Sequence, residues 1–122
     1  MIININKNNK INILCYVVSF KHLLNLKILF NTKKFNLTCI YEKNLKLIDE
    51  RKFKELGYNY ISYYQKTSLE NILKKKLFNF YFLSTTPLRK LPIKLITSAL
   101  IKKIPTFSVQ EVHQMYLHEG TI

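Results

Sequence analysis

Five short runs of apolar, β-branched and aromatic residues recur along the chain, and each is typical of a β-strand. The first run, residues 11–19 (INILCYVVS), is almost wholly apolar, as expected for a central strand that is buried on both faces. The remaining strands are predicted at residues 35–41, 58–64, 78–84 and from residue 106 onward.

The segments between the first three strands carry helical spacing. Residues 20–30 place Phe20 and Leu24 among apolar positions that recur every three or four residues. A second helix is predicted to begin at the cap residue Asn44 and to end before Gly57, which stands where a left-handed glycine commonly follows a helix.

Two further helices are predicted in the second half of the chain. Residues 67–70 (TSLE) match a capping box, in which Thr67 and Glu70 satisfy each other's backbone amides at a helix start. Pro92 suits the first turn of a last helix that continues to about Lys102, since a proline there costs no hydrogen bond within the helix.

Strands that alternate with helices through short connections must pair in parallel. We therefore predict an α/β fold: a Rossmann-like, three-layer parallel sheet of about five strands in the order 3-2-1-4-5, with four helices. Residues 1–10 are predicted to be a lead-in, and residues 11–122 are predicted to form a single domain.

Charge narrows the range of partners. The 122 residues include 20 basic and 7 acidic side chains, for a net charge of +13, which would attract nucleic acid, an anionic membrane surface or phosphorylated substrates.

Cys15 and Cys39 lie inside apolar runs without a CxxC pair, which indicates packing in a reducing, cytoplasmic compartment. The longest apolar stretch has ten residues, about half of what a bilayer-spanning helix needs.

Several familiar site motifs are absent. The segment after the first strand reads SFKHLLN, without the glycines that let a backbone approach a pyrophosphate. The chain has no HExxH metal motif, and His113 and His118 lack the spacing of a metal site, so we expect no metal. The nucleophile elbow GxSxG is also missing.

Because these motifs are absent, the chemistry left to consider is acid–base catalysis by the last segment, residues 106–122. Glu111 or His113 could deprotonate an acceptor hydroxyl held within about 3 Å. The plainer interpretation is that Glu111 is a solvated surface residue and that His113 bonds to a neighbouring loop. Loops at the carboxyl ends of strands 1, 4 and 5 supply the candidate substrate-binding residues Ser19, His22, Thr85, Thr86 and Gln110.

The run IPTFSVQEVHQMYLHEGTI at residues 104–122, with a basic helix before it, resembles the N-terminal half of two-domain GT-B-type glycosyltransferases. The similarity is greatest to bacterial enzymes of capsular and other surface polysaccharide synthesis. It implies that residues 11–122 are the N-terminal, acceptor-side half of a two-domain enzyme, truncated so that the sheet is incomplete and the chain is inactive alone. It further implies that a nucleotide-sugar donor is bound only with a second, donor-binding domain on another chain. It also implies a lipid-linked acceptor at the anionic inner face of the membrane, with no bound cofactor.

A basic nucleic-acid-binding module is the alternative. The charge and the 16 Phe and Tyr residues would supply phosphate attraction and stacking surface. Against this, Phe78, Phe80 and Phe82 fall inside a predicted strand, where aromatic rings belong to the core. No RNP, KH or helix-turn-helix signature is present.

Overall fold

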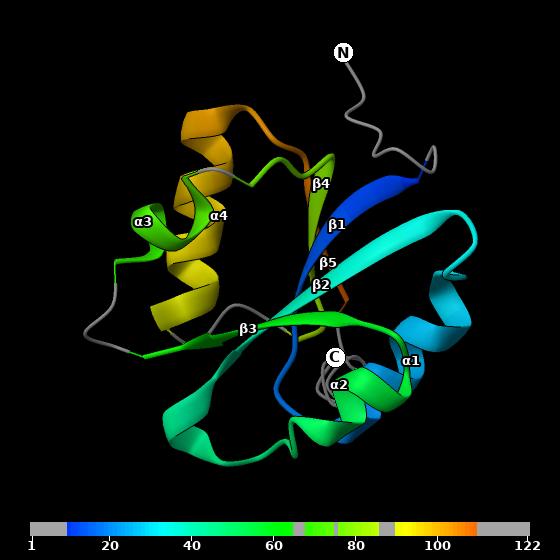
Figure 1. The fold of residues 1–122 in the computed structure, drawn as a ribbon. Coiled ribbons are helices and arrows are strands. Elements are labelled where there is room, and N and C mark those ends of the chain that lie inside the picture. Colours follow the sequence, from blue (N-terminus) through cyan, green and yellow to red (C-terminus); the bar gives the residue numbers. More distant parts are fainter. Residues whose placement is uncertain (1–9, 65–67, 75, 86–89, 110–122) are drawn as a thin grey trace, which may run out of the picture.

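The computed structural model describes residues 10–64, 68–74, 76–85 and 90–109. In this part of the chain, strands and helices alternate as the hydrophobic pattern predicts (Figure 1). The elements are β1 (Ile11–Tyr16), α1 (Phe20–Leu29), β2 (Phe35–Glu42), the 3-10 turn η1 (Lys43–Leu45), α2 (Arg51–Glu55), β3 (Asn59–Tyr63), α3 (Leu69–Leu73), β4 (Phe80–Leu83), α4 (Lys90–Lys102) and β5 (Thr106–Ser108).

The described strands form one parallel sheet in the order β3-β2-β1-β4-β5. This confirms the predicted α/β, Rossmann-like arrangement and its strand order. The central strand β1 pairs with β2 on one side and with β4 on the other. Its last residue, Tyr16, lies opposite Ile40 of β2 and Leu83 of β4.

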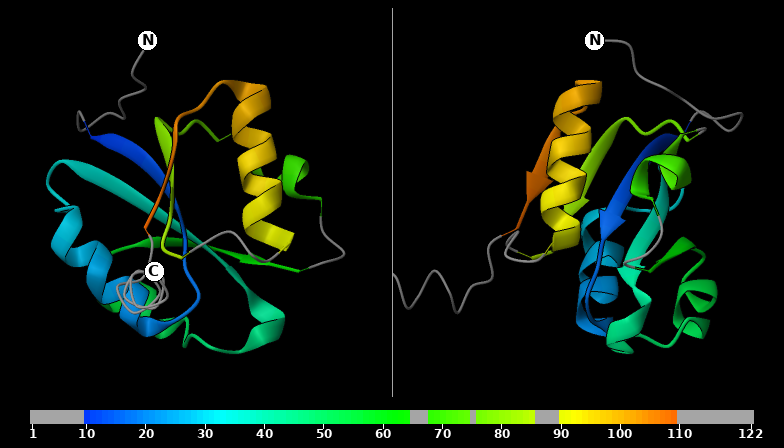
Figure 2. Two further views of the ribbon diagram at one scale, coloured as in Figure 1. Left: turned by 180° about the vertical axis from the view of Figure 1, so that it is seen from behind. Right: turned by 90° about the vertical axis from the view of Figure 1, so that its left-hand side faces the viewer.

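Alternate residues of the strands point to opposite faces and form two cores. On one face, Ile13 and Cys15 of β1 pack with Leu23 of α1 and Phe53 of α2. On the other face, Leu14 of β1 belongs to a cluster completed by α3 and α4. The views in Figures 1 and 2 show α3 and α4 together on one side of the sheet and α1 and α2 on the other, which gives the three predicted layers.

The second predicted helix is the main error of the sequence analysis. The chain between β2 and β3 forms the short turn η1 and the five-residue helix α2 in place of one continuous helix. Lys46 adopts a left-handed conformation (φ 54°) directly after η1, which breaks the helical hydrogen-bond ladder. Asn44 lies inside η1, and so it does not cap a helix.

Helix ends agree more closely with their predictions. Gly57 follows α2 with a φ of 76°, as predicted for a glycine after a helix. The N-cap of α3 is Ser68, whose hydroxyl accepts the Asn71 backbone N–H at 3.4 Å, so the cap lies one residue beyond the predicted Thr67. Pro92 lies in the first turn of α4, as predicted.

The two cysteines pack as small apolar residues, as predicted. Cys15 of β1 and Cys39 of β2 are register partners on neighbouring strands, and both are buried free thiols. Burial raises the pKa of each thiol well above its ordinary value. The thiolate is therefore disfavoured at neutral pH, and neither side chain has the properties of a nucleophile.

Candidate functional site

The switch point of the sheet lies at the carboxyl ends of β1 and β4. The connection from β1 turns toward β2 and that from β4 turns toward β5, so the two loops diverge there. The Ser84 backbone N–H donates to the Tyr16 carbonyl at 3.1 Å and ties the end of β4 to the end of β1. The predicted substrate-binding residues Ser19 and Thr85 follow these two strand ends.

Ser19 and His22 shape the loop that leaves β1. Ser19 is the N-cap residue of α1 in extended conformation, and its side chain makes no capping hydrogen bond. His22 is buried, and its Nδ1 accepts the Val18 backbone N–H at 3.0 Å. That bond fixes the path of the loop and leaves Ser19 at the border of the switch point, where a ligand of an α/β sheet is expected.

The other sequence candidates fall outside the described residues: Thr86, Gln110, Glu111 and His113. The described chain follows β5 to Ser108 and then to Val109, whose N–H donates to the Leu83 carbonyl at 3.0 Å. The roles of Glu111 and His113 as a base therefore stay predictions.

A carboxylate that sequence reasoning missed lies at the same edge. The Tyr16 hydroxyl donates to Glu42 Oε1 at 2.9 Å, and this bond links the last residue of β1 to the last residue of β2. Tyr16 is fully buried, whereas Glu42 is partly exposed. An oriented carboxylate of this kind can accept a hydrogen bond from a ligand hydroxyl.

Tyr63 extends this polar edge toward α4. It ends β3 and lies opposite Glu42 in the β2–β3 register. Lys94 Nζ donates to the Tyr63 hydroxyl at 3.2 Å and lies 5.8 Å from the centre of its ring. Lys94 thus brings a positive charge from α4 toward the edge that carries the Glu42 carboxylate.

A second network occupies the opposite face of the same strand ends. The Tyr41 hydroxyl donates to Glu50 Oε1 and lies 2.9 Å from the Ser62 hydroxyl, and Lys43 Nζ lies 3.0 Å from Glu50 Oε1. The hydrogen bonds from Tyr41 and Lys43 lower the pKa of Glu50 to about 2. Burial and the bond to Glu50 raise the pKa of Tyr41 to about 12. Both groups therefore keep one protonation state near neutral pH, which suits a structural tie between β2, β3 and the segment before α2.

The sequence does contain a signal for Glu42. It is the first acidic residue in the chain, and it directly follows the predicted strand 35–41 beside the central strand. Acidic residues at that place in Rossmann-like sheets commonly receive ligand hydroxyls. The partner Tyr16 gives no such signal, because a tyrosine inside an apolar run is indistinguishable from a core aromatic.

Metal and membrane-spanning features are not found in the part of the chain that the structure describes. No group of three or more His, Cys, Asp and Glu side chains there is arranged to hold a metal ion. Over the same residues, no helix combines the length and the apolar character that crossing a bilayer requires.

An apolar cavity of about 510 Å³ lies on the face that carries α1 and α2. Phe30, Phe80 and Phe107 line it, and the rings of Phe80 and Phe107 meet edge to face with their centres 5.3 Å apart. Because the lining is almost entirely hydrocarbon, this cavity offers little to orient a polar substrate. The carboxyl edge of β1, β2 and β4 is therefore the better candidate site.

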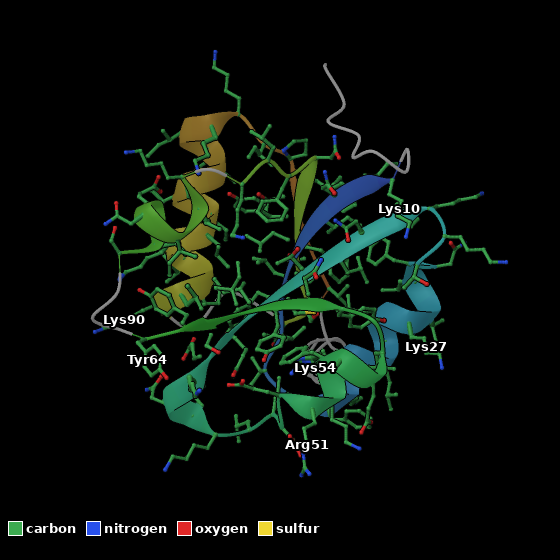
Figure 3. All side chains as sticks on the ribbon, viewed as in Figure 1. Lys10, Lys27, Arg51, Lys54, Tyr64 and Lys90 are labelled. Carbon is green, nitrogen blue, oxygen red and sulfur yellow. The ribbon has the colours of Figure 1, made fainter. Side chains whose placement is uncertain are left out.

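Basic side chains are spread around the molecule. Figure 3 shows Lys10, Lys27, Arg51, Lys54 and Lys90 on several sides of the molecule. Nucleic-acid-binding domains usually gather such charges on one face or along one helix.

Comparison of the chain with protein-family models, with curated proteins and with solved structures finds no match.

Proposed function

We propose that this chain is an acceptor-side domain of a glycosyltransferase, which binds a hydroxylated acceptor at the carboxyl edge of β1, β2 and β4. One observation carries the proposal: the Glu42 carboxylate, held by the Tyr16 hydroxyl at 2.9 Å, lies beside the topological switch point of a parallel sheet. Ligands of open α/β sheets bind at this place. A carboxylate has about four acceptor positions, so it can receive a sugar hydroxyl in addition to the Tyr16 hydroxyl.

The chemical step would then fall to the last segment of the chain. Glu111 or His113 would accept the proton of the acceptor hydroxyl, and Glu42, Ser19 and Thr85 would position that acceptor. The nucleotide-sugar donor would be bound by a second domain on another chain, so this chain by itself would bind the acceptor without turning it over.

The exposed face of α1 supports an acceptor that is carried by a membrane. Phe20, Leu24 and Ile28 follow one another at a spacing of four residues, and their exposed fractions are 40%, 42% and 83%. Lys21 and Lys27 are exposed on the same helix. An apolar stripe between lysines suits the surface of an anionic bilayer. Since α1 begins at the switch point, a cytoplasmic protein lying on the inner membrane face along α1 would hold its site close to lipid-linked acceptors.

The test is a titration of isotope-labelled protein, followed by the NMR shifts of its amides. We expect polyprenyl phosphate in detergent micelles, or a neutral oligosaccharide, to shift Ser19, Ser84 and Thr85. A nucleoside diphosphate sugar should leave these amides unchanged. Glu42→Gln should weaken acceptor binding about tenfold, the effect of one lost charged hydrogen bond. Glu55→Gln, the same substitution on the exposed side of α2, is the control.

Two results would contradict the proposal. Acceptors of both kinds could fail to shift the amides around the switch point, or Glu55→Gln could weaken binding as much as Glu42→Gln. A further titration, with single-stranded RNA at physiological salt, tests the alternative function. Binding of RNA tighter than the non-specific level of about 10⁻⁴ M, with shifts at the same amides, would favour a nucleic-acid-binding module.

A further inference from the structure

A row of asparagines crosses the amino ends of three neighbouring strands. Asn36 Nδ2 donates to Asn12 Oδ1 at 3.0 Å, and Asn59 Nδ2 donates to Asn36 Oδ1 at 3.3 Å, so the carboxamides of β1, β2 and β3 form a chain of hydrogen bonds. Asparagine is disfavoured in strands, and the faces of a parallel sheet are usually covered by apolar residues. Three asparagines side by side on such a face therefore call for an explanation.

The row opens into the larger of the two cavities described here. This cavity of about 700 Å³ is lined by all three asparagines, by Thr38 and by the segment that leads from α3 to β4. The helix α3 has only five residues, and its buried side chains are Leu69 and Leu73. This part of the sheet face is consequently left open to solvent, at the end of the strands opposite to the candidate acceptor site.

The asparagine row retains unused hydrogen-bonding capacity. A carboxamide has two N–H donors and two acceptor lone pairs, and the two bonds within the row use only one of each on Asn36. Donors and acceptors therefore alternate along the row. Asn12 and Asn36 are register partners on neighbouring strands, whereas Asn59 lies opposite Thr38, two residues beyond Asn36 in β2. Hydroxyl groups, which donate and accept at once, are the chemical groups that match such an arrangement best.

Among the residues that the structure describes, the charged side chains at the rim are all basic. Lys54 reaches the cavity from α2 and Lys76 from the segment before β4, and no described aspartate or glutamate lines it. Neither lysine forms an ion pair with an acidic side chain of the described residues. A ligand that carries carboxylates as well as hydroxyls would meet both the asparagine row and these ammonium groups.

Two of the three aromatic residues that line the cavity pack against other rings, and the third, Tyr58, is buried. Tyr60 stacks on Phe53 with ring centres 5.0 Å apart, and Phe78 meets Tyr81 edge to face at 6.1 Å. Phe78 is also buried. Binding of single-stranded nucleic acid relies on open ring faces for base stacking. The cavity therefore favours a ligand that is recognised through hydroxyl hydrogen bonds.

We infer that this cavity is a binding site for an acidic saccharide, with Asn12, Asn36 and Asn59 receiving its hydroxyls and Lys54 and Lys76 its carboxylates. The site is separate from the carboxyl edge and does not depend on the proposed glycosyltransferase function. A domain with such a site would hold an acidic glycan along the amino ends of its strands.

The experiment measures binding of a short oligogalacturonide to the full chain by calorimetry and by amide NMR shifts. We expect shifts at Asn12, Asn36 and Asn59 and none at Ser19 or Thr85. Asn36→Ala, which removes both bonds of the row, should weaken binding about tenfold, as should Lys76→Gln. Lys27→Gln removes the same charge from an exposed site on α1 and should change affinity less than twofold.

One more variant separates binding from folding. Asn59 is exposed at the end of the row, so Asn59→Ala should weaken binding while the midpoint of thermal unfolding stays that of the wild type. Equal losses in Lys76→Gln and Lys27→Gln would mean general attraction of polyanions and would overturn the site. A neutral oligosaccharide of the same length that binds equally well would overturn the acidic class. If a DNA oligonucleotide of equal charge binds more tightly, and Asn36→Ala weakens that binding, the assignment of a saccharide as the ligand would be overturned.

Discussion

At the scale of single residues, the polar groups at the carboxyl edge divide into two kinds. Glu50 has its carboxylate bonded to Tyr41, Ser62 and Lys43, and these bonds tie the strand ends together. Glu42 is held by Tyr16 at the border of the switch point, where a ligand can reach it. The first arrangement acts on stability and the second on binding, so substitutions should separate the two effects.

Glu50 provides a test through pH. Its folded pKa of about 2 lies below the ordinary carboxyl value of about 4.3, so its contribution to stability is present above the ordinary value and is lost as the pH falls toward 2. The loss should be modest, because the carboxylate is partly exposed. We expect urea unfolding to show a smaller difference in free energy between pH 6 and pH 3 for Glu50→Gln than for the wild type.

Tyr41→Phe removes a donor to the same carboxylate and should cost about 1 kcal/mol at pH 6. Glu55→Gln, on the solvent side of α2, should keep the wild-type difference between pH 6 and pH 3. If Glu50→Gln shows the full wild-type difference, the Glu50 network does not contribute to the acid sensitivity of the fold.

At the scale of elements, the sequence predicts regular structure best where the pattern is long and apolar. The run at residues 11–19 predicts β1 at the centre of the sheet, and Pro92 correctly indicates the start of α4. The hydrophobic pattern predicts the wrong structure for residues 44–56, because a lysine gives no sequence signal for the left-handed backbone conformation that Lys46 adopts. Glu42 is predictable only in part: its position after the strand 35–41 is visible in the sequence, but its bond to Tyr16, 26 positions away in the chain, exists only in the folded sheet.

The exposed helices also allow a test of membrane binding. Ile28 of α1 and Leu100 of α4 are both strongly exposed, with fractions of 83% and 74%, but they belong to helices on opposite faces of the sheet. If α1 is the face that meets the membrane, Ile28→Ser should reduce sedimentation with vesicles rich in phosphatidylglycerol several-fold, because it removes buried apolar contact. Leu100→Ser should leave sedimentation unchanged.

Vesicles of neutral phosphatidylcholine complete that measurement. Binding to them should be weak for every variant, since each lysine near an anionic surface contributes about 1 kcal/mol that a neutral surface does not. Equal effects of Ile28→Ser and Leu100→Ser would show that no single face of the protein binds the membrane. The exposed face of α1 would then no longer support a membrane-bound acceptor.

At the scale of the whole molecule, stability is expected to be graded from the centre of the sheet to its β5 border. Leu14, Cys15 and Tyr16 of β1 are at most 1% exposed and are paired on both sides. The border strand β5 has three residues, and its central Phe107 is 54% exposed. Figure 2 shows β5 beside β4 at the border of the sheet. The two candidate sites lie at opposite ends of the same well-packed central strands, so each rests on the stable part of the fold.

Hydrogen exchange can measure this gradient directly. We expect the amides of Leu14, Cys15 and Tyr16 to exchange only through global unfolding, and those of Phe107 and Ser108 to exchange much faster through local opening. Leu14→Ala should cost about 2–5 kcal/mol and accelerate exchange throughout the sheet, because it leaves a cavity in the core. Phe107→Ala should accelerate exchange in β5 alone. Protection of β5 equal to that of β1 would mean that the sheet opens as one unit. The free energy of opening would then be the same at both candidate sites.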